Sequence, residues 1–396
     1  MAISHLSIIT GGYPSPAQPT HTLFVRQFAH AVARQRVKCT VIHPVAVHKS
    51  VDRKGFPFRS IEPAGDGRNV EVLRPSFLSL SARKSFVRFG KLNPGLVTLW
   101  SFTRAVKSIL RQMAIRPDAL YGHFLFLAGA AAVIVGEDLG IPSFPGIGES
   151  VKPGDTIWTV AKYSNSTTKD NFSDVCGLIV NSSLLKRMTA QQLSFSETRI
   201  GVFPNGIDPK RFYPRSKESM RKRFRLPEDS FLVGCTGHFS HRKGQQRVLD
   251  AMTGLENVGG IFVGSCVPAS STVPVFFNRV VDHEQVPGLL SACDVFVLPT
   301  LAEGSSNAII EAMACGLPIV SSKGEFNDDL LTNELSIRVD PLDICEIRNA
   351  ICTLRNDSAL RARMAAAALQ RAQQFDINAR ARCILNFMAG NMEVDR

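Results

Sequence analysis

The chain has 396 residues, of which 44% are hydrophobic, which is enough to build the cores of two or three domains. No apolar run approaches the roughly 18 residues that a membrane-spanning helix needs. The net charge of +12 favours acidic partners such as anionic lipid or phosphorylated substrates. No compact basic motif of a nucleic-acid-binding module occurs, so we expect no nucleic-acid partner.

The nine cysteines are scattered and odd in number, and none forms a Cys-x-x-Cys pair. The first residues, MAISHLSIIT, lack the basic region and the small-residue cleavage site of a signal peptide, and they predict a first strand. We therefore expect reduced thiols in a cytoplasmic protein and no zinc site.

The first 70 residues follow a strand–loop–helix–strand pattern. An apolar strand is predicted over 4–10, a helix over the apolar stripe 23–32, and a second strand over 38–43. The loop between the first strand and the helix begins with Gly11 and Gly12, but it lacks the full Gly-x-Gly-x-x-Gly pattern of a dinucleotide site. Residues 53–69 are rich in glycine, proline and charge, which predicts a loop.

A basic segment without any acidic residue extends over 72–117. Its cations alternate with aromatic residues, a mixture that can dock on an anionic membrane surface or can form the solvated face of a helix whose other side is buried. The residues concerned are Arg74, Phe77, Arg83, Lys84, Phe86, Arg88, Phe89, Lys91, Trp100, Phe102, Arg104, Lys107, Arg111 and Arg116.

Further along the chain, several polar side chains follow predicted strands. His123 comes at the end of a short strand over 119–121, and Glu149 follows a strand that begins at 143. The segment 203–214 reads FPNGIDPKRFYP, whose prolines and Asn-Gly turn predict a linker between two domains. A second domain then opens with the strand 231–235, followed by Lys243 in a basic turn.

The stretch 294–322 reads DVFVLPTLAEGSSNAIIEAMACGLPIVSS and predicts a strand, a loop, a helix and a second strand. The apolar run 295–298 suits a strand of a parallel sheet that is buried on both faces. Ser305 or Ser306 can cap the following helix, because a hydroxyl accepts a hydrogen bond from an unpaired amide of the first turn. Gly316 then ends the helix.

Two carboxylates frame this loop. Glu303 lies at the tip of the strand, and Glu311 follows Gly304 by seven positions and Asn307 by four, which places these three on one helix face. In an open α/β sheet, ligands bind at this carboxyl edge of the strands. The helix amides and dipole suit an anion, while the carboxylates suit hydroxyl groups. A nucleotide sugar carries both, and two solvated glutamates in an ordinary crossover are the alternative.

The segment EGSSNAIIEAMACGLPIV resembles the glutamate–seven residues–glutamate signature of retaining glycosyltransferases of family 4, which have the GT-B fold. This resemblance implies an α/β protein with two Rossmann-like domains that face a cleft and a C-terminal helix that returns to the first domain. We assign 1–203 to an acceptor domain, 204–375 to a nucleotide-sugar domain and 376–396 to the returning helix.

The resemblance also implies the roles of the donor-site residues. Glu311 is expected to hold the ribose hydroxyls, Glu303 the sugar hydroxyls, and Lys243 the leaving diphosphate. The family places an arginine at the position of His238, so either His238 or the neighbouring Arg242 is expected to take part. The expected amide contacts to sugar and phosphate come from Gly304, Ser305, Ser306 and Asn307.

In the first domain, the resemblance places His123 at the cleft, in contact with the donor sugar near the reacting centre. Gly12 is expected to contact the distal phosphate and Gly11 the acceptor, although both can simply serve a tight turn. Thr22 stands where relatives have a glycine. Glu149 replaces part of a His-Gly-Ser-Asp pattern and is assigned to the acceptor side.

The implied activity is retaining transfer of a sugar from a nucleotide diphosphate sugar, with Glu303, His123 and Lys243 at the reacting centre and with neither metal nor other cofactor. The expected acceptor is a lipid-linked glycan of a bacterial surface polysaccharide, exopolysaccharide or lipopolysaccharide, reached from the cytoplasm through peripheral membrane contact by 72–117. Two alternatives stay open. One is a non-catalytic scaffold that binds a nucleotide sugar, and the other is a sugar-nucleotide epimerase.

Overall fold

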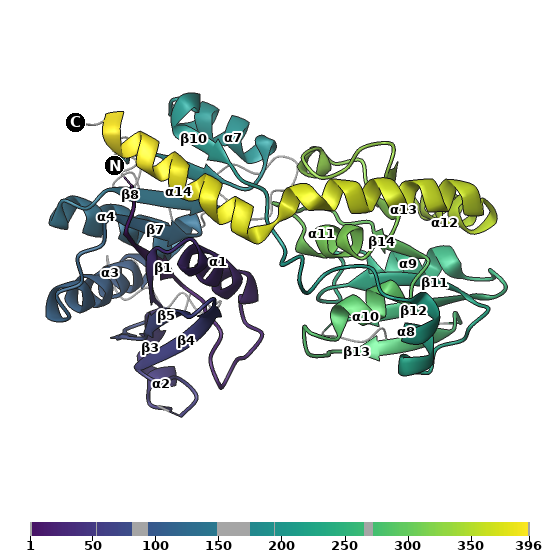
Figure 1. Ribbon diagram of the computed structural model, residues 1–396, viewed down its shortest axis with the longest axis horizontal. Helices are drawn as coiled ribbons and strands as arrows, with labels where there is room; N and C mark the ends of the chain where they lie inside the picture. Colours follow the sequence, from purple (N-terminus) through teal and green to yellow (C-terminus); the bar gives the residue numbers. More distant parts are fainter. Residues whose placement is uncertain are drawn as a thin grey trace. The chain divides into compact units, whose positions relative to one another are not determined.

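A computed structural model describes residues 2–52, 54–80, 94–148, 175–193, 195–264 and 272–394 (Figure 1). These residues form two compact units. The first unit combines the described residues up to 203 with the last helix, α14 (Ile377–Val394), and the second unit is Pro204–Asp376. Each unit is a sheet with helices, and the chain passes from one to the other within the linker segment and again before α14.

The sheet of the first unit has the strand order β10-β9-β8-β7-β1-β2-β5-β4. All neighbours in it are parallel except the pair β4 and β5. A second small sheet pairs β3 (Val45–Ala46) with β6 (Ser76–Phe77). The strands of the large sheet are β1 (His5–Thr10), β2 (Lys38–Ile42), β4 (Arg59–Gly65), β5 (Arg68–Leu73), β7 (Ala119–His123), β8 (Ser143–Ile147), β9 (Leu178–Val180) and β10 (Ile200–Val202).

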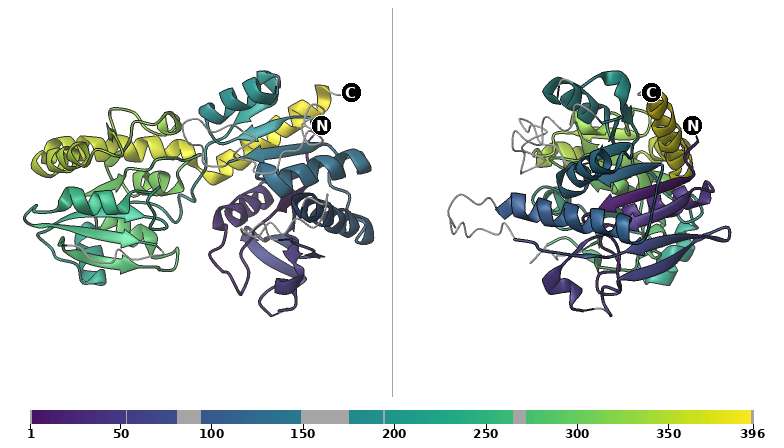
Figure 2. Two further views of the ribbon diagram at one scale, coloured as in Figure 1. Left: turned by 180° about the vertical axis from the view of Figure 1, so that it is seen from behind. Right: turned by 90° about the vertical axis from the view of Figure 1, so that its left-hand side faces the viewer.

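Helix α14 completes the core of the first unit. Its buried stripe includes Ile377, Ala381, Ile384 and Met388, and these side chains pack in one cluster with Phe28. Helix α14 packs beside α1, as Figure 1 and the left view of Figure 2 show. The other helical segments of the unit are α1 (Leu23–Arg34), α2 (Val47–Ser50), α3 (Pro94–Gln112), η1 (Leu125–Gly129), α4 (Ala130–Leu139), α7 (Ser183–Leu193) and η2 (Glu197–Arg199).

The prediction of a loop over 53–69 is wrong for residues 59–69, which contribute to a β-hairpin, whereas residues 54–58 form no helix or strand. Strands β4 and β5 pair antiparallel around Asp66 and Gly67, whose φ angles are 52° and 70°. Two successive positive φ angles define the two-residue turn that matches the twist of hairpin strands, and Asp-Gly is a preferred sequence for it. Arg59 and Arg68 of this hairpin are exposed, whereas Glu62 is largely buried and pairs with Arg26 and His30 of α1.

The basic segment 72–117 is only partly a surface. Arg74 is 1% exposed, and Phe77 and Phe102, the latter on the buried face of α3, lie in one core cluster, so these three residues are not available to a membrane. Trp100 is 61% exposed. Residues 81–93, which include Arg83, Lys84 and Arg88, lie outside the described residues. None of the described helices combines the length and apolar character needed to cross a bilayer.

The second unit has a parallel sheet of order β13-β12-β11-β14-β15-β16. The neighbours β11 and β14 lie at its centre and are buried along their whole length. The strands are β11 (Phe231–Thr236), β12 (Val258–Val263), β13 (Val275–Arg279), β14 (Val295–Leu298), β15 (Ile319–Ser322) and β16 (Ser336–Val339). The helical segments are α8 (Lys217–Phe224), α9 (Gln245–Met252), α10 (Val286–Ser291), α11 (Asn307–Ala314), η3 (Glu325–Asn327), α12 (Ile344–Asn356), α13 (Ser358–Ala372) and η4 (Gln373–Phe375).

Candidate active site

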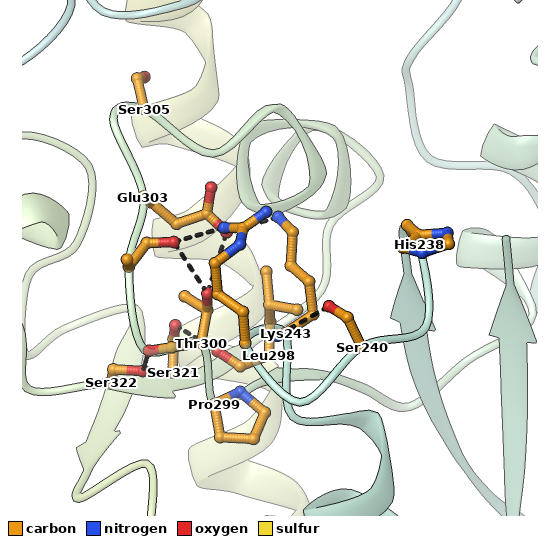
Figure 3. A network of polar contacts seen from close by, with 12 residues as sticks. His238, Ser240, Lys243, Leu298, Pro299, Thr300, Glu303, Ser305, Ser321 and Ser322 are labelled. Carbon is orange, nitrogen blue, oxygen red and sulfur yellow. Dashed lines mark hydrogen bonds and ion pairs between the residues drawn. The ribbon is translucent and has the colours of Figure 1, made fainter. Parts of the chain in front are cut away.

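Glu303 is the centre of a polar cluster at the carboxyl edge of the second sheet (Figure 3). Its Oε1 atom accepts a hydrogen bond of 2.5 Å from Lys243 Nζ and one of 3.1 Å from Thr300 Oγ1. Arg242 Nη1 lies 3.5 Å from the same oxygen. All these donors meet at Oε1, and no described residue donates to Oε2. The carboxylate is therefore held in place while one of its oxygens stays available.

The residues beneath this cluster fix its geometry. Thr300 is fully buried, and its carbonyl accepts a hydrogen bond from Ser322 Oγ at 2.5 Å. Gly244, directly after Lys243, has a φ of 82°, and a Cβ atom there would lie 2.5 Å from the Pro299 carbonyl oxygen. Only glycine fits both the left-handed conformation and this close approach. Sequence reasoning missed Thr300 and Ser322, although polar residues that end buried strands are a usable signal.

The first turn of α11 is left without the cap that its sequence suggests. Ser306 is the N-cap residue, but its hydroxyl accepts no hydrogen bond from the turn. Ser306 Oγ and Asn307 Oδ1 are buried without a hydrogen-bond partner in the described structure. A helix N-terminus with unpaired amides attracts anions. The amide edge and these two side chains thus form a polar surface that lacks a protein partner.

Ser305 is held by the linker segment. Its hydroxyl accepts a hydrogen bond of 3.0 Å from the Asn205 amide, and its carbonyl accepts one of 2.8 Å from Asn205 Nδ2. Asn205 belongs to the Asn-Gly turn of the predicted linker, and its contact with Ser305 was not foreseen. The buried Gly304 precedes Ser305 in the same loop.

Glu311 lies on α11 and has a different partner from Glu303. Its Oε1 accepts a hydrogen bond of 3.0 Å from His283 Nε2, and the side chain of Glu311 is 13% exposed. His283 comes from the loop between β13 and α10 and was not among the predicted site residues.

The two candidates for the cationic position differ in placement. Arg242 joins the cluster, because its Nη1 also donates to the Ala302 carbonyl at 2.6 Å. His238 is exposed and lies apart from the Lys243–Glu303 pair in Figure 3. The structure therefore brings Arg242, and not His238, to Glu303.

In the first unit, His123 ends β7, and its environment keeps it neutral. Burial, with the nearby Arg380 guanidinium, lowers the pKa of His123 to about 3. Its Nδ1 lies 3.1 Å from the Tyr121 hydroxyl, which also hydrogen-bonds Arg380. Arginine only donates, so the Tyr121 oxygen accepts from Arg380, and its O–H can donate to Nδ1. In that tautomer the ring proton is on Nε2, which is buried and has no partner among the described residues.

The two glycines after β1 have different surroundings. Gly11 is exposed, and a Cβ atom there would meet nothing within 4 Å. Gly12 is buried, its amide donates to Thr10 Oγ1 at 3.2 Å, and a Cβ atom would lie 2.8 Å from the His21 ring. Neither glycine has a positive φ. The predicted acceptor-side residue Glu149 lies outside the described residues.

Comparisons with known proteins agree with this architecture. Residues 230–357 match the family model of glycosyl transferases group 1. The Bacillus subtilis protein TuaC, named for a glycosyltransferase role in teichuronic acid biosynthesis, is 26% identical over 79% of each chain. The sucrose-phosphate synthase of Thermosynechococcus elongatus has a TM-score of 0.73 at 20% identity and covers 99% of this chain and 100% of its own. Anabaena HepE in complex with UDP-glucose has a TM-score of 0.69 at 18% identity, with 98% and 100% covered.

The fold and the matched segment define the class of this protein. The predicted fold class, α/β with two Rossmann-like domains of the GT-B type, is confirmed. The segment that contains Lys243, Glu303 and Glu311 matches the family model of glycosyl transferases group 1. The chain has the GT-B fold, and it is similar in sequence to bacterial glycosyltransferases such as TuaC.

Proposed function

We propose that the protein is a retaining glycosyltransferase that uses a nucleotide diphosphate sugar without a metal ion or other cofactor. The observation that carries this proposal is the cluster at the N-terminus of α11, where Lys243 and Arg242 converge on Glu303 beside unpaired helix amides. A diphosphate needs cations and amide donors, and a sugar needs carboxylate acceptors. The loop before α9 supplies the cations, and the loop between β14 and α11 supplies the carboxylate and the amide donors.

In the proposed complex, Lys243 and Arg242 stabilise the charge that develops on the leaving diphosphate. The free Oε2 of Glu303 accepts from sugar hydroxyls, and the amides from Gly304 to Asn307 bind phosphate and sugar. Glu311 accepts from both ribose hydroxyls, as a carboxylate can. Cationic side chains thus supply the charge that a metal ion supplies in other transferases.

In the same proposal, the neutral His123 donates from Nε2 to a hydroxyl of the donor sugar. A neutral imidazole suits this role, because it donates one hydrogen bond without repelling the cations that the diphosphate requires. The leaving phosphate takes the proton of the acceptor hydroxyl on the face from which it departs, so that the configuration at the anomeric carbon is retained.

The proposed acceptor is a lipid-linked glycan in the synthesis of a bacterial surface polymer, reached from the cytoplasmic face of the membrane. Its support is the name of TuaC, which refers to teichuronic acid biosynthesis, and the basic character of the chain. Anionic lipid surfaces attract basic proteins. The exposed Trp100 is the described residue of 72–117 best suited to a lipid interface.

The first test is a thermal-shift screen against UDP, GDP, ADP and their common sugars in the presence of a metal chelator. A ligand at one hundred times its dissociation constant adds about 2.7 kcal/mol of stability to the protein. We expect one nucleotide to raise the melting temperature of the wild type and to have a much smaller effect on Glu311→Gln. The absence of a shift with every nucleotide would contradict the donor site.

The catalytic step is tested with Lys243→Met, which keeps the length of the side chain and removes its charge. We expect sugar transfer to fall by about a hundredfold or more, since charge stabilisation at a leaving group is commonly worth that much. His238→Gln is the matched control in the same loop, and it should retain most of the activity. NMR of the product anomer would show whether the configuration is retained.

A non-catalytic scaffold is the second candidate function. It is favoured by His238, which stands where the resemblance expects an arginine and is exposed and apart from Glu303. A scaffold would bind the nucleotide sugar, as seen in the thermal-shift screen, yet would transfer no sugar to any acceptor. An epimerase would release a free sugar epimer without any acceptor, which product analysis detects directly.

A further inference from the structure

Glu311 is the inner end of a chain of three side chains that begins in the linker segment. Arg211 Nη1 lies 3.0 Å from His283 Nδ1, and His283 Nε2 lies 3.0 Å from Glu311 Oε1. The side chains are 34%, 23% and 13% exposed, in the order Arg211, His283, Glu311. Both ring nitrogens of one histidine are therefore occupied, with a cation on one side and a carboxylate on the other.

The chemistry of the two partners fixes the proton on the imidazole ring. Arginine has only donors, so Nδ1 of His283 must accept and carry no proton. Glu311 as a carboxylate only accepts, so Nε2 must carry the proton and donate it. The guanidinium thus selects the tautomer that can hold the carboxylate, and the ring is also packed edge-on against Phe212, with centroids 5.3 Å apart.

We propose that Arg211 and His283 are positioning residues for the donor nucleotide, which they serve by orienting Glu311 toward the ribose. This inference rests on the proposed function, since it assigns the ribose to Glu311. The hydrogen bond from His283 occupies Oε1, and no described residue donates to Oε2, which leaves that oxygen for the sugar hydroxyls of the nucleotide. Without His283, the carboxylate of Glu311 can rotate, and part of the binding free energy is lost to ordering it.

Two isosteric variants of His283 separate its contact with Arg211 from its contact with Glu311. In His283→Gln, the amide nitrogen can take the place of Nε2 and still donate to Glu311. In His283→Asn, the side-chain oxygen can take the place of Nδ1 and accept from Arg211, but nothing reaches Glu311. Both variants lose the aromatic ring, so the loss of packing on Phe212 is common to them.

The measurement is calorimetric titration of the full-length protein with whichever of UDP, GDP and ADP gives the largest thermal shift, and with its 2′,3′-dideoxy counterpart. We expect His283→Asn to weaken binding of the ribonucleotide about tenfold, as for a hydrogen bond to a charged group, and His283→Gln to stay within about twofold of the wild type. The dideoxy nucleotide should bind all three proteins alike, because it lacks the hydroxyls that Glu311 holds.

Arg211→Met should also weaken binding of the ribonucleotide. In the double variant with His283→Asn it should reduce the affinity little further, because the two residues act through one contact with Glu311. Glu284→Gln is the matched control, since Glu284 is 83% exposed and lies 3.9 Å from Arg211 without reaching Glu311. With a donor sugar, the effect should appear in KM and leave kcat unchanged, as expected for uniform binding.

Three results would overturn the positioning role. His283→Asn could bind the ribonucleotide as the wild type does, both histidine variants could be equally weak, or the dideoxy nucleotide could lose as much affinity as the ribonucleotide. If Glu311→Gln binds every nucleotide as the wild type does, or if no nucleotide binds, then the proposed donor site itself fails and the positioning role fails with it. Loss with Glu311→Gln alone would retain the donor site and reject only the role of His283 and Arg211.

Discussion

Thr22 has a backbone conformation that β-branched residues avoid. It precedes α1 with φ 49° and ψ 43°, in the left-handed region, which costs an L-residue about 1–2 kcal/mol. Glycine, the residue that the family resemblance expects at this position, adopts this conformation freely. The sequence departs from the expected pattern, while the backbone keeps the conformation that the pattern requires.

We expect Thr22→Gly to raise the free energy of unfolding by about 1 kcal/mol relative to Thr20→Gly. Both substitutions loosen the unfolded chain equally, but only the first relieves a strained φ, since Thr20 has no positive φ. Denaturation by guanidinium measures both. Equal effects of the two substitutions would mean that Thr22 carries no strain.

Single residues of the site could be predicted only where a local motif names them. Glu303 and Glu311 belong to one short motif with a fixed spacing, and Lys243 belongs to a second one. In the structure, Lys243 donates a hydrogen bond to Glu303. His283 and Asn205 escape such reasoning, because each meets its partner across a long separation in the chain and neither contact leaves a pattern in its own segment. Their roles require the fold.

At the scale of the element, α11 is a helix whose N-cap hydroxyl does not cap it. We expect Ser306→Ala to change the free energy of unfolding by less than about 0.5 kcal/mol, because this hydroxyl is buried without a partner. Ser216→Ala should cost about 1 kcal/mol, because Ser216 Oγ accepts from the Ser219 amide at 3.2 Å and caps α8. Guanidinium titrations followed by circular dichroism compare the two.

If Ser306→Ala costs as much as Ser216→Ala, the Ser306 hydroxyl caps α11 in solution, and the argument for unpaired amides at the donor site weakens. If it costs nothing in stability and weakens nucleotide binding, the hydroxyl is reserved for the ligand.

Helices and strands could be predicted where the apolar pattern was strong. The prediction was wrong where a charged, glycine-rich composition suggested a loop. The buried strands β11 and β14 are continuous apolar runs, so their positions follow from the sequence. The β4–β5 hairpin does not, because its edge strands carry charge and its Gly-Asp-Gly turn suggests a loop. In β5, the buried Val70 and Val72 alternate with polar residues, which is the pattern of a strand. The composition of the segment hid this pattern.

At the scale of the whole molecule, the first unit should be sensitive to acid. Burial, with the charge of Arg74, lowers the pKa of His43 to about 3, as burial and Arg380 do for His123. In the unfolded chain both histidines have a pKa of about 6.5. Between these values the unfolded state binds more protons, so stability is complete above about pH 6.5 and falls as the pH decreases toward 3.

Each of the two histidines should contribute a loss of about 1.4 kcal/mol per pH unit within that window. We expect the urea midpoint of the first unit to fall steadily from pH 6.5 to pH 4, and His43→Asn to show a shallower slope. A midpoint that does not depend on pH across this range would show that these side chains are solvated. Transfer activity should show no titration of His123 near neutrality, because its pKa lies far below that range.

Helix α14, the last element of the chain, belongs to the core of the first unit, and this fixes the order in which the protein can mature on the ribosome. The remainder of the first unit is synthesised by residue 203, yet Ile384 and Met388 arrive roughly 180 residues later. At about 5–20 residues per second, the nascent first unit waits roughly 10–40 s before α14 can pack beside α1. The described part of the second unit, Pro204–Asp376, is contiguous and can fold during that interval, so the unit that is made first is completed last.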